Sequence, residues 1–261
     1  MNSLQHGQAV FSLLFRRDMR ILSGQIVSNS INSLVIVFLQ IVMLGYFLPA
    51  QGLDTEFIFP LFLGNMFISF FSVGFQYSMQ MTFDLSGAQL FAYHYSIVNA
   101  RLWVLLAYFL GVFIRLAIFS TIICVVGVIF LHYTAEITIQ LPYLLVIYTL
   151  SLAFFSLLFL ATGIGFTPED HMDNLWPRLF IFLLTFGSVT YTWKRINSLS
   201  PLLSKLFLLN PVTYCTEGMR GAFLGTTNYI SPIACISVLL IAIGVLSLLV
   251  SIALRKRIDP V

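Results

Sequence analysis

Charged side chains are scarce in this sequence, which excludes an ordinary soluble domain. Aspartate, glutamate, lysine and arginine make up 9% of the 261 residues, and hydrophobic residues make up 59%. In soluble domains about a quarter of the residues are charged. The mean hydropathy of +0.96 agrees with this deficit. The composition therefore predicts a membrane protein that crosses the bilayer several times.

Cysteine is also rare, and the chain has only Cys124, Cys215 and Cys235. An odd number without paired spacing provides neither a disulfide framework nor a zinc site, so we interpret all three as packing residues. We interpret the acidic stretch Thr167–Asn174 as a surface loop. No metal site is predicted.

Signatures of catalysis are missing as well. The loop that cradles nucleotide phosphates ends in Gly-Lys, and no lysine of this chain follows a glycine. No His-Glu-x-x-His helix and no serine in a nucleophile elbow occurs. We therefore predict that the chain is not an enzyme and binds no cofactor itself.

Long apolar runs dominate what remains. About 20 helical residues cross the hydrocarbon core of a bilayer, and the runs are Ile26–Leu48, Ile58–Met81, Trp103–Leu131, Leu141–Phe166, Leu179–Trp193 and Ile233–Leu254. The predicted fold is thus an all-α integral membrane protein with six transmembrane helices. The fifth run is short and a broken apolar segment follows it, which predicts a re-entrant outer segment before the last span.

Basic residues gather at both ends of the chain. Val10–Leu22 predicts an amphipathic helix whose arginines face lipid headgroups at the membrane interface. The last span ends in Arg255, Lys256 and Arg257. Because lysine and arginine mark the cytoplasmic side, both termini are predicted to lie in the cytoplasm, under the plasma (inner) membrane. The predicted parts are residues 1–25 with the interface helix, 26–254 as the transmembrane domain and 255–261 as a basic tail.

Arg115 is a charge inside the third predicted span. At the bilayer centre an arginine costs about 2.5 to 3.5 kcal/mol on insertion scales, so it needs a partner or a route to water. Two interpretations stay open: the side chain reaches toward the inner surface, or it meets substrate or an acid of the pore. The amides Asn29, Asn32 and Gln40 in the first span are expected to face other helices or another subunit.

The segment Phe83–Arg101 is too polar to span a membrane and too apolar for an inert linker. Asp84 or Ser86 can start a helix, and Leu90 and Tyr93 recur at helical spacing. The segment therefore predicts an amphipathic helix at the cytoplasmic side. It either docks on a partner or lies on the membrane surface.

The stretch Leu206–Gly225 interrupts the apolar pattern before the last span. Asn210 and Pro211 form a helix-start signal, because the asparagine can cap free N–H groups and proline tolerates the first turn. On that helix Glu217 and Arg220 are three residues apart and can pair. Exchanging both charges is therefore expected to preserve the pair.

This pattern of Asn-Pro-x-Thr-Tyr, then Glu-x-x-Arg and glycine before a last apolar run, resembles the C-terminal signature of the permeases of type 2 ABC (ABC-2) exporters. The resemblance covers nearly the whole chain. It implies a coupling helix that contacts a separate ABC ATPase subunit, with Asp84, Gly87, Leu90 and Tyr93 in this role. The proline often found toward the end of that helix is missing.

The same resemblance implies an outer gate formed by Asn210, Pro211, Glu217 and Arg220, and a second permease subunit that is expected to be identical. ATP and Mg²⁺ would bind the ATPase, membrane lipids would be further partners, and no nucleic acid is expected. The implied function is outward transport of an amphipathic substrate: a lipid-linked glycan, a lipid or a hydrophobic drug. An ion-gradient-driven secondary transporter and a non-transporting subunit of a membrane assembly remain as alternatives.

Overall fold

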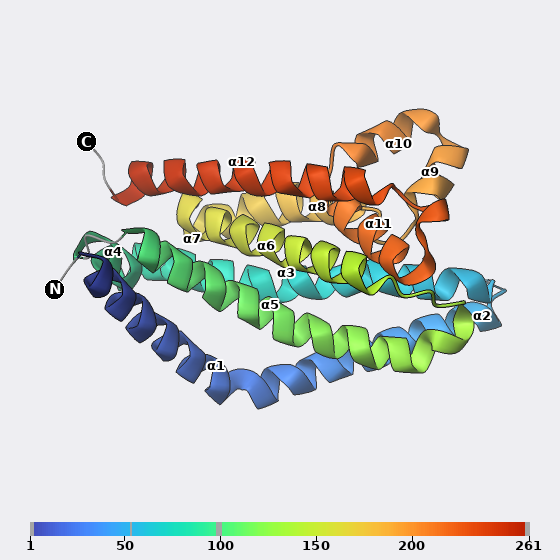
Figure 1. The fold of residues 1–261 in the computed structure, drawn as a ribbon, viewed down its shortest axis with the longest axis horizontal. Helices are drawn as coiled ribbons and strands as arrows, with labels where there is room; N and C mark the ends of the chain where they lie inside the picture. Colours follow the sequence, from blue (N-terminus) through green and yellow to red (C-terminus); the bar gives the residue numbers. More distant parts are fainter. Residues whose placement is uncertain (1–2, 53, 98–100, 259–261) are drawn as a thin grey trace.

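The computed structural model describes residues 3–52, 54–97 and 101–258, and every regular element in these ranges is helical. Residues 98–100 of the expected coupling segment and 259–261 of the expected tail lie outside the described residues. Figure 1 shows an elongated bundle of antiparallel helices. Its α-helices are α1 Ser3–Val42, α2 Leu48–Ala50, α3 Ile58–Ser86, α4 Leu90–Ile97, α5 Arg101–Leu131, α6 Leu141–Gly165, α7 Pro168–Asp170, α8 Ile181–Thr185, α9 Trp193–Leu199, α10 Pro201–Leu208, α11 Pro211–Leu224 and α12 Pro232–Ile258.

Five helical segments of the described residues are long and apolar enough to cross a membrane. They are Gly7–Ala50, Thr55–Ser86, Arg101–Thr134, Leu141–Gly165 and Pro232–Arg257. By helix length and hydropathy the chain is therefore a multi-pass membrane protein.

The fifth predicted run, Leu179–Trp193, does not form a continuous helix. The helix begins earlier, at Pro168, continues through a π-helical stretch His171–Phe180 and ends with α8 at Thr185. Pro177 lies inside the π-helical stretch, and proline lacks the N–H that a regular helical turn requires. The predicted bounds were wrong at both ends: the helix begins at Pro168, before the apolar run, and ends at Thr185, inside it.

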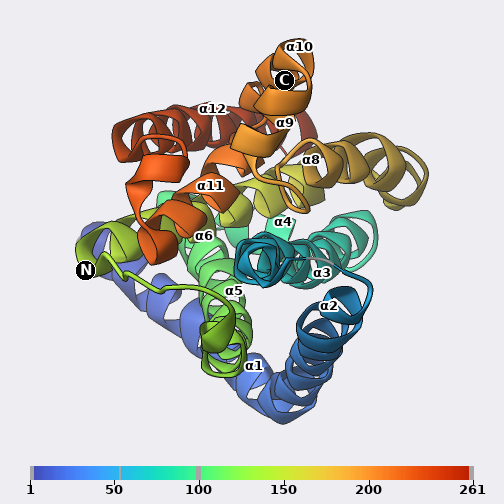
Figure 2. The ribbon, with the colours of Figure 1, turned by 90° about the vertical axis from the view of Figure 1, so that its right-hand side faces the viewer.

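The N-terminal segment differs from the expected arrangement of a separate interface helix and a first span. Both belong to α1, which runs without interruption from Ser3 to Val42, so the expected boundary at residue 25 falls within one helix. The helix bends, and its two halves form a V in the end-on view (Figure 2). The amphipathic pattern holds in the first half, because Arg16 and Arg20 are exposed while Leu14 and Leu22 are buried.

Two hydrophobic clusters hold the bundle together. The larger one is rich in phenylalanine: Phe67 and Phe70 of α3 lie 5.9 and 5.1 Å, centroid to centroid, from Phe155 of α6. Such aromatic contacts add to the free energy of area burial. The smaller cluster joins Leu14, Phe91, Tyr95 and Val104 to residues of α3, α6 and α12. It fixes α4 to the bundle.

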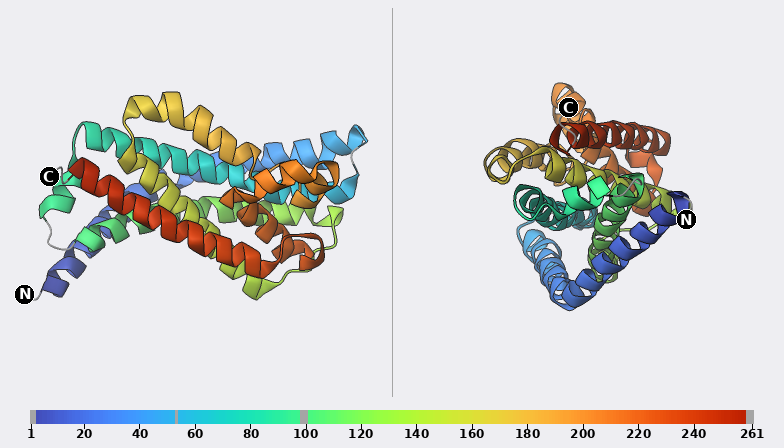
Figure 3. Two further views of the ribbon diagram at one scale, coloured as in Figure 1. Left: turned by 90° about the horizontal axis from the view of Figure 1, so that it is seen from above. Right: turned by 90° about the vertical axis from the view of Figure 1, so that its left-hand side faces the viewer.

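Both chain termini lie at the same end of the bundle, together with α4, while α2, α9 and α10 lie at the opposite end (Figures 1 and 3). We call these the α4 end and the α9–α10 end. The chain leaves α6 at the α4 end and enters α12 from the opposite end (Figure 1). The segment between α6 and α12 therefore travels the length of the bundle once more, partly as the helix Pro168–Thr185.

Candidate functional site

The helix α4 is held in place by a carboxylate cap. Asp84, near the end of α3, accepts hydrogen bonds from the backbone N–H groups of Leu90 at 3.3 Å and Phe91 at 2.8 Å. Its carbonyl oxygen accepts a further bond from Gln89 N at 2.6 Å, and Gln89 has a positive φ of 51°. Gly87 follows α3 directly and lies in this turn. The turn thus sets α4 in a fixed orientation to α3.

The two faces of α4 differ in burial. Phe91 and Tyr95 are inserted into the smaller hydrophobic cluster, with 0% and 8% of their surface exposed. Leu90 and Tyr93 lie outside this cluster, with 50% and 62% of their surface exposed, and Leu90 also borders a cavity next to α3 and α5. Helical residues one position apart face different directions, so one short helix presents an anchored face and an uncovered apolar face.

A polar groove runs between α1, α3 and α5 and begins beside α4. It consists of two cavities of about 290 and 70 Å³ that share Tyr77, Gln80 and Arg115. The polar residues that line it are Arg17, Asp18, Gln25, Asn29, Asn32, Ser33, Ser72, Gln76, Tyr77, Gln80, Asp84, Tyr108 and Arg115. Leu90 of α4 also lines the larger cavity. The groove thereby connects the cap of α4 with the middle of the bundle.

Arg115 pairs with an acid in this groove. Its guanidinium donates two hydrogen bonds of 2.7 Å to the two carboxylate oxygens of Asp18 on α1, and the ring centroid of Tyr77 lies 5.2 Å from its Cζ. The side chains are only 11% and 18% exposed. A Cβ at Gly111, one turn before Arg115, would collide with the Asp18 carboxylate, so glycine permits this approach. Arg115 thus has a carboxylate partner on α1, and both interpretations of its role remain predictions.

The predicted helix start at Asn210 and Pro211 is confirmed. Asn210 caps α11, because its Oδ1 accepts a bond of 3.0 Å from Val212 N, and Pro211 occupies the first turn. The Asn210 Nδ2 also donates to the carbonyl oxygen of Leu183 in α8 at 2.8 Å. The turn at Asn210 is therefore tied to the end of α8. From there α11 runs toward the α9–α10 end of the bundle (Figure 1).

One face of α11 supplies hydrogen bonds to the segment that follows α8. Thr213 Oγ1 donates to the carbonyl of Phe186 at 3.0 Å, and Thr216 Oγ1 donates to that of Gly187 at 2.8 Å. A chain that leaves helical geometry has carbonyl groups without intrahelical partners. These donors recur at positions 210, 213, 216 and 220, which is the spacing of one helical face.

Arg220 completes this row of donors from a fully buried position. Its Nη1 donates to Glu217 Oε1 at 2.8 Å and to Ser188 O at 2.7 Å, and its Nη2 donates to Val189 O at 2.9 Å. Its Nε donates to Pro60 O of α3 at 2.8 Å. Both Glu217 and Arg220 have no exposed surface. The arginine therefore links α3, α11 and the segment after α8.

Glu217 and Gly64 make this arrangement possible. Glu217 Oε1 accepts a second bond, of 3.0 Å, from the N–H of Trp193 at the start of α9, while its Oε2 has no partner among the described residues. A Cβ at Gly64 would collide with Val189 O and with Arg220 Nη2. The cluster is thus built on a close approach between α3 and the segment after α8.

Sequence reasoning found Arg115, Glu217 and Arg220 but missed Asp18, Tyr77 and the glutamines of α3 that line the groove. A usable signal was present, because Gln76 and Gln80 are four residues apart in an apolar span and so share one helical face. No comparable signal marks Asp18, which lies among the arginines of an expected surface helix.

Comparisons with known proteins do not assign the chain to a family. No family model matches it, and a search of curated proteins finds no match either.

Proposed function

We propose that the chain is the membrane-spanning permease subunit of an ATP-driven ABC-2 exporter, powered by a separate ATPase subunit that binds ATP and Mg²⁺. The observation that carries the proposal is the placement of α4. Its uncovered face, with Leu90 and Tyr93, lies at the end of the bundle, and its anchored face is packed against helices that line the polar groove. A force on this helix would therefore reach the groove.

Coupling would proceed through rigid contacts. The Asp84 cap and the buried Phe91 prevent α4 from moving independently of α3 and α5. Movement of the ATPase subunits would shift α4 as a unit, and Leu90 and Asp84 line the groove that would change shape. Packed helices of this kind respond by discrete displacements rather than by continuous deformation.

The proposed cargo is an amphipathic molecule moved outward: a lipid-linked glycan, a lipid or a hydrophobic drug. Amide and hydroxyl groups of the groove can replace the hydrogen bonds that a polar headgroup loses when it leaves water. The surrounding apolar helix surface suits hydrocarbon. A second, identical permease subunit would complete the path, membrane lipids would surround it, and nucleic acid has no part in this function.

In this proposal the chain crosses the plasma (inner) membrane six times, and residues 26–254 form the transmembrane domain. The α4 end faces the cytoplasm, together with residues 1–25 and the basic tail 255–261. The sixth crossing is the helix Pro168–Thr185 with the segment that follows it. The segment with Asn210, Pro211, Glu217 and Arg220 then forms the outer gate. Irregular backbone at membrane depth needs protein groups as hydrogen-bond partners, and this segment provides them.

The proposal is tested on the exposed face of α4. The tagged full-length chain is purified from membranes of the cells that naturally produce it, and ATP hydrolysis in the eluate is measured. The measurement is repeated with lipid-linked glycans, hydrophobic drugs or simple ions added as possible stimulants. The double variant Leu90→Asp, Tyr93→Asp should lose the co-purified ATPase activity. The matched control is Leu199→Asp, Leu202→Asp, because these leucines are also exposed but lie on α9 and α10. If the α4 variant keeps as much co-purified ATPase activity as the control variant and the unmodified chain, coupling through α4 is refuted.

A secondary transporter driven by an ion gradient is the second candidate, and the Asp18–Arg115 pair favours it. Ionisable residues that pair with one another inside membrane spans mark substrate and ion pathways. Transport by the purified chain alone, driven by a pH gradient and abolished in Asp18→Asn, would establish this alternative. Transport that requires ATP and an ATPase subunit would exclude it.

A further inference from the structure

A large pocket lies on the side of the bundle away from the polar groove. It has a volume of about 700 Å³ and lies between α6, the π-helical stretch His171–Phe180 and α12. In both side and end views α12 and α8 lie opposite the bend of α1, which borders the groove (Figures 1 and 2). The pocket is therefore separate from the proposed transport path.

The walls of this pocket are apolar over most of their length. They include Leu158, Ala161, Leu246, Leu249, Ile252 and Ala253. Leu249 and Ile252 are 48% and 61% exposed although they belong to a candidate membrane span. In a bilayer, a surface of this kind is covered by hydrocarbon rather than by water. A volume of this size lies within the range of about 300–1,000 Å³ in which small-molecule sites occur.

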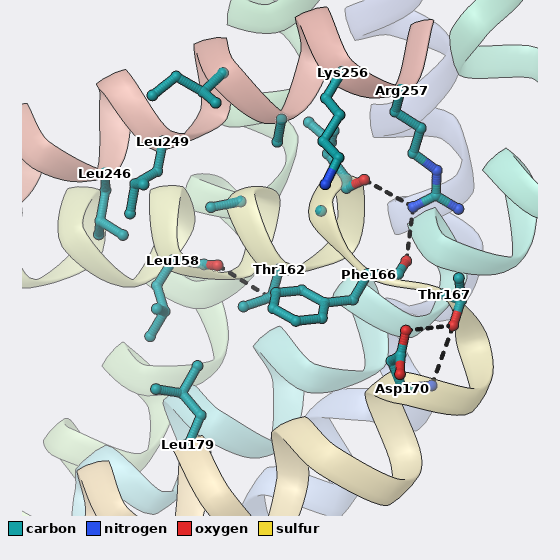
Figure 4. Close-up of a pocket in the computed structure, with 15 residues that line it drawn as sticks. Leu158, Thr162, Phe166, Thr167, Asp170, Leu179, Leu246, Leu249, Lys256 and Arg257 are labelled. Atoms are coloured by element: carbon teal, nitrogen blue, oxygen red, sulfur yellow. Dashed lines mark hydrogen bonds between the residues drawn. The ribbon is translucent and has the colours of Figure 1, made fainter.

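Charged groups gather at one end of the pocket only. Figure 4 shows Lys256 and Arg257 on α12 above the loop with Phe166 and Thr167. Arg257 is fixed, because its Nη1 donates to the carbonyls of Ile164 and Phe166 at 2.7 Å each. Lys256 makes no hydrogen bond or ion pair with any described residue, and its side chain extends toward the pocket (Figure 4). Among the described residues, one cation without a partner thus lies at this end of the pocket.

The acid at this end, Asp170, forms no ion pair with Lys256 and accepts hydrogen bonds from neutral groups instead. Asp170 accepts a hydrogen bond of 2.9 Å from Thr167 Oγ1 on one oxygen and one of 3.1 Å from Asn174 Nδ2 on the other. Both carboxylate oxygens therefore have donors within their own helix start. The described residues that line this end of the pocket include two cations and one acid, which favours an anionic ligand group.

We propose that this pocket binds one phospholipid with an anionic headgroup, which remains with the folded permease and is not its cargo. An acyl chain lies along the apolar wall of α6 and α12, and the headgroup phosphate lies at Lys256. The charged end of the pocket is formed by the last turn of α12, which carries three basic residues and lies at the α4 end of the bundle (Figure 1). The basic end of the pocket matches the anionic headgroup of a lipid, and the apolar wall next to it matches the acyl chain.

The test uses the full chain alone, without an ATPase, so its outcome is independent of the proposed transport function. The protein is delipidated by detergent exchange and incubated with mixed micelles of phosphatidylglycerol and phosphatidylethanolamine in equal amounts. Native mass spectrometry then counts the bound lipids. We expect one tightly bound phosphatidylglycerol per chain and a preference over phosphatidylethanolamine of about fivefold, since one basic residue near an anionic lipid gives about this factor.

Two kinds of variant distinguish binding of the lipid headgroup from binding of the acyl chain. Lys256→Glu should abolish the preference for phosphatidylglycerol, while Arg255→Glu, which makes the same charge change at a residue that does not line the pocket, should keep it. Ala253→Phe and Ile252→Trp should both prevent binding by filling the cavity. Ile252 is exposed, so folding does not depend on its size. Gly244→Phe is the control for added bulk, because a side chain there meets no neighbour within 4 Å.

Three results would overturn the proposal. The filling variants could bind lipid as well as the unmodified chain, Arg255→Glu could lose the preference as fully as Lys256→Glu, or Gly244→Phe could lose as much lipid as Ala253→Phe. The last two would indicate only a general lipid annulus. A change of oligomeric state in the filling variants with unchanged lipid binding would show that a second copy of the chain occupies the pocket.

Discussion

The buried arginine of α11 works through its shape as much as through its charge. Guanidinium has five N–H donors in a fixed plane, and Arg220 directs them at one carboxylate and at the carbonyl groups of Pro60, Ser188 and Val189. Lysine has the same charge but cannot reach oxygens in several directions at once. The pair with Glu217 is therefore only one part of the role of Arg220.

This asymmetry gives the first prediction. Glu217→Gln keeps an acceptor oxygen for Arg220 and for Trp193 N, whereas Arg220→Gln leaves Glu217 buried beside carbonyls that lack donors. We expect Arg220→Gln to cost about 3–5 kcal/mol of stability, as is typical for an uncompensated buried charge, and Glu217→Gln to cost clearly less. Thermal unfolding of the purified chain in detergent measures both. Equal losses would reduce Arg220 to an ordinary ion-pair partner.

The structure also changes the expectation for exchanging the two charges. A glutamate at position 220 can only accept hydrogen bonds and would face four backbone carbonyl groups. We therefore predict that the exchanged variant Glu217→Arg, Arg220→Glu is no more stable than Arg220→Glu alone. Unfolding temperatures of the two variants decide the point. Rescue by the exchange would favour simple pairing.

The second ion pair is expected to behave as a coupled unit. Asp18→Asn leaves Arg115 largely buried without its carboxylate, and Arg115→Gln leaves Asp18 in the same situation. Each single change should cost about 1.5–3 kcal/mol, as for hydrogen bonds to charged groups, and the double change should cost less than their sum. Unfolding of the four proteins forms the double-mutant cycle. Additive losses would show that the contact contributes little to the packing of α1 on α5.

At the scale of elements, α4 depends on its cap. Asp84→Ala removes the acceptors for Leu90 N and Phe91 N and should destabilise the helix start by about 1 kcal/mol. We expect hydrogen exchange in α4 to become roughly fivefold faster. Asp84→Asn is the matched control, because it keeps one acceptor oxygen. Unchanged exchange in Asp84→Ala would mean that Phe91 and Tyr95 alone hold the helix.

The elements that could be predicted are those whose determinants are local. The start of α11 was readable because Asn210 caps its own helix, and the helical spacing of Leu90 and Tyr93 located α4. The expected start of that helix at Asp84 or Ser86 was wrong, because both residues belong to the end of α3. The break after Thr185 was not readable, since its carbonyls find donors on α11 about 30 residues later. The partner of Arg115 is 97 residues distant. No local pattern contains such contacts.

For the whole molecule, the position of the two termini constrains how many times the chain crosses the membrane. Five segments meet the criteria of length and hydropathy, yet both chain ends lie at the α4 end of the bundle (Figure 1). An odd number of crossings would place the termini on opposite sides of the membrane. The stretch between α6 and α12 must therefore cross as well if all five candidate spans do. The backbone after Thr185 finds hydrogen-bond donors on α11, as irregular backbone at membrane depth requires.

The last prediction tests this sixth crossing directly. Single cysteines are placed at Glu169 and Thr227, which are exposed and flank the stretch in question, in a background where Cys124, Cys215 and Cys235 are alanine. Asp54 and Ala88 serve as reference positions at the two ends of α3, and Asp84 is left intact because it caps α4. A thiol reagent that cannot cross membranes is added to intact cells.

With six crossings, Thr227 and Asp54 should react from outside, and Glu169 and Ala88 should react only after the membrane is permeabilised. This follows from the Lys/Arg excess at the α4 end, which orients that end toward the cytoplasm. Reaction of Glu169 and Thr227 from the same side would show that the segment between α6 and α12 does not cross. The termini would then lie on opposite sides of the bilayer, and α4 and the basic end of α12 could not both face a cytoplasmic ATPase.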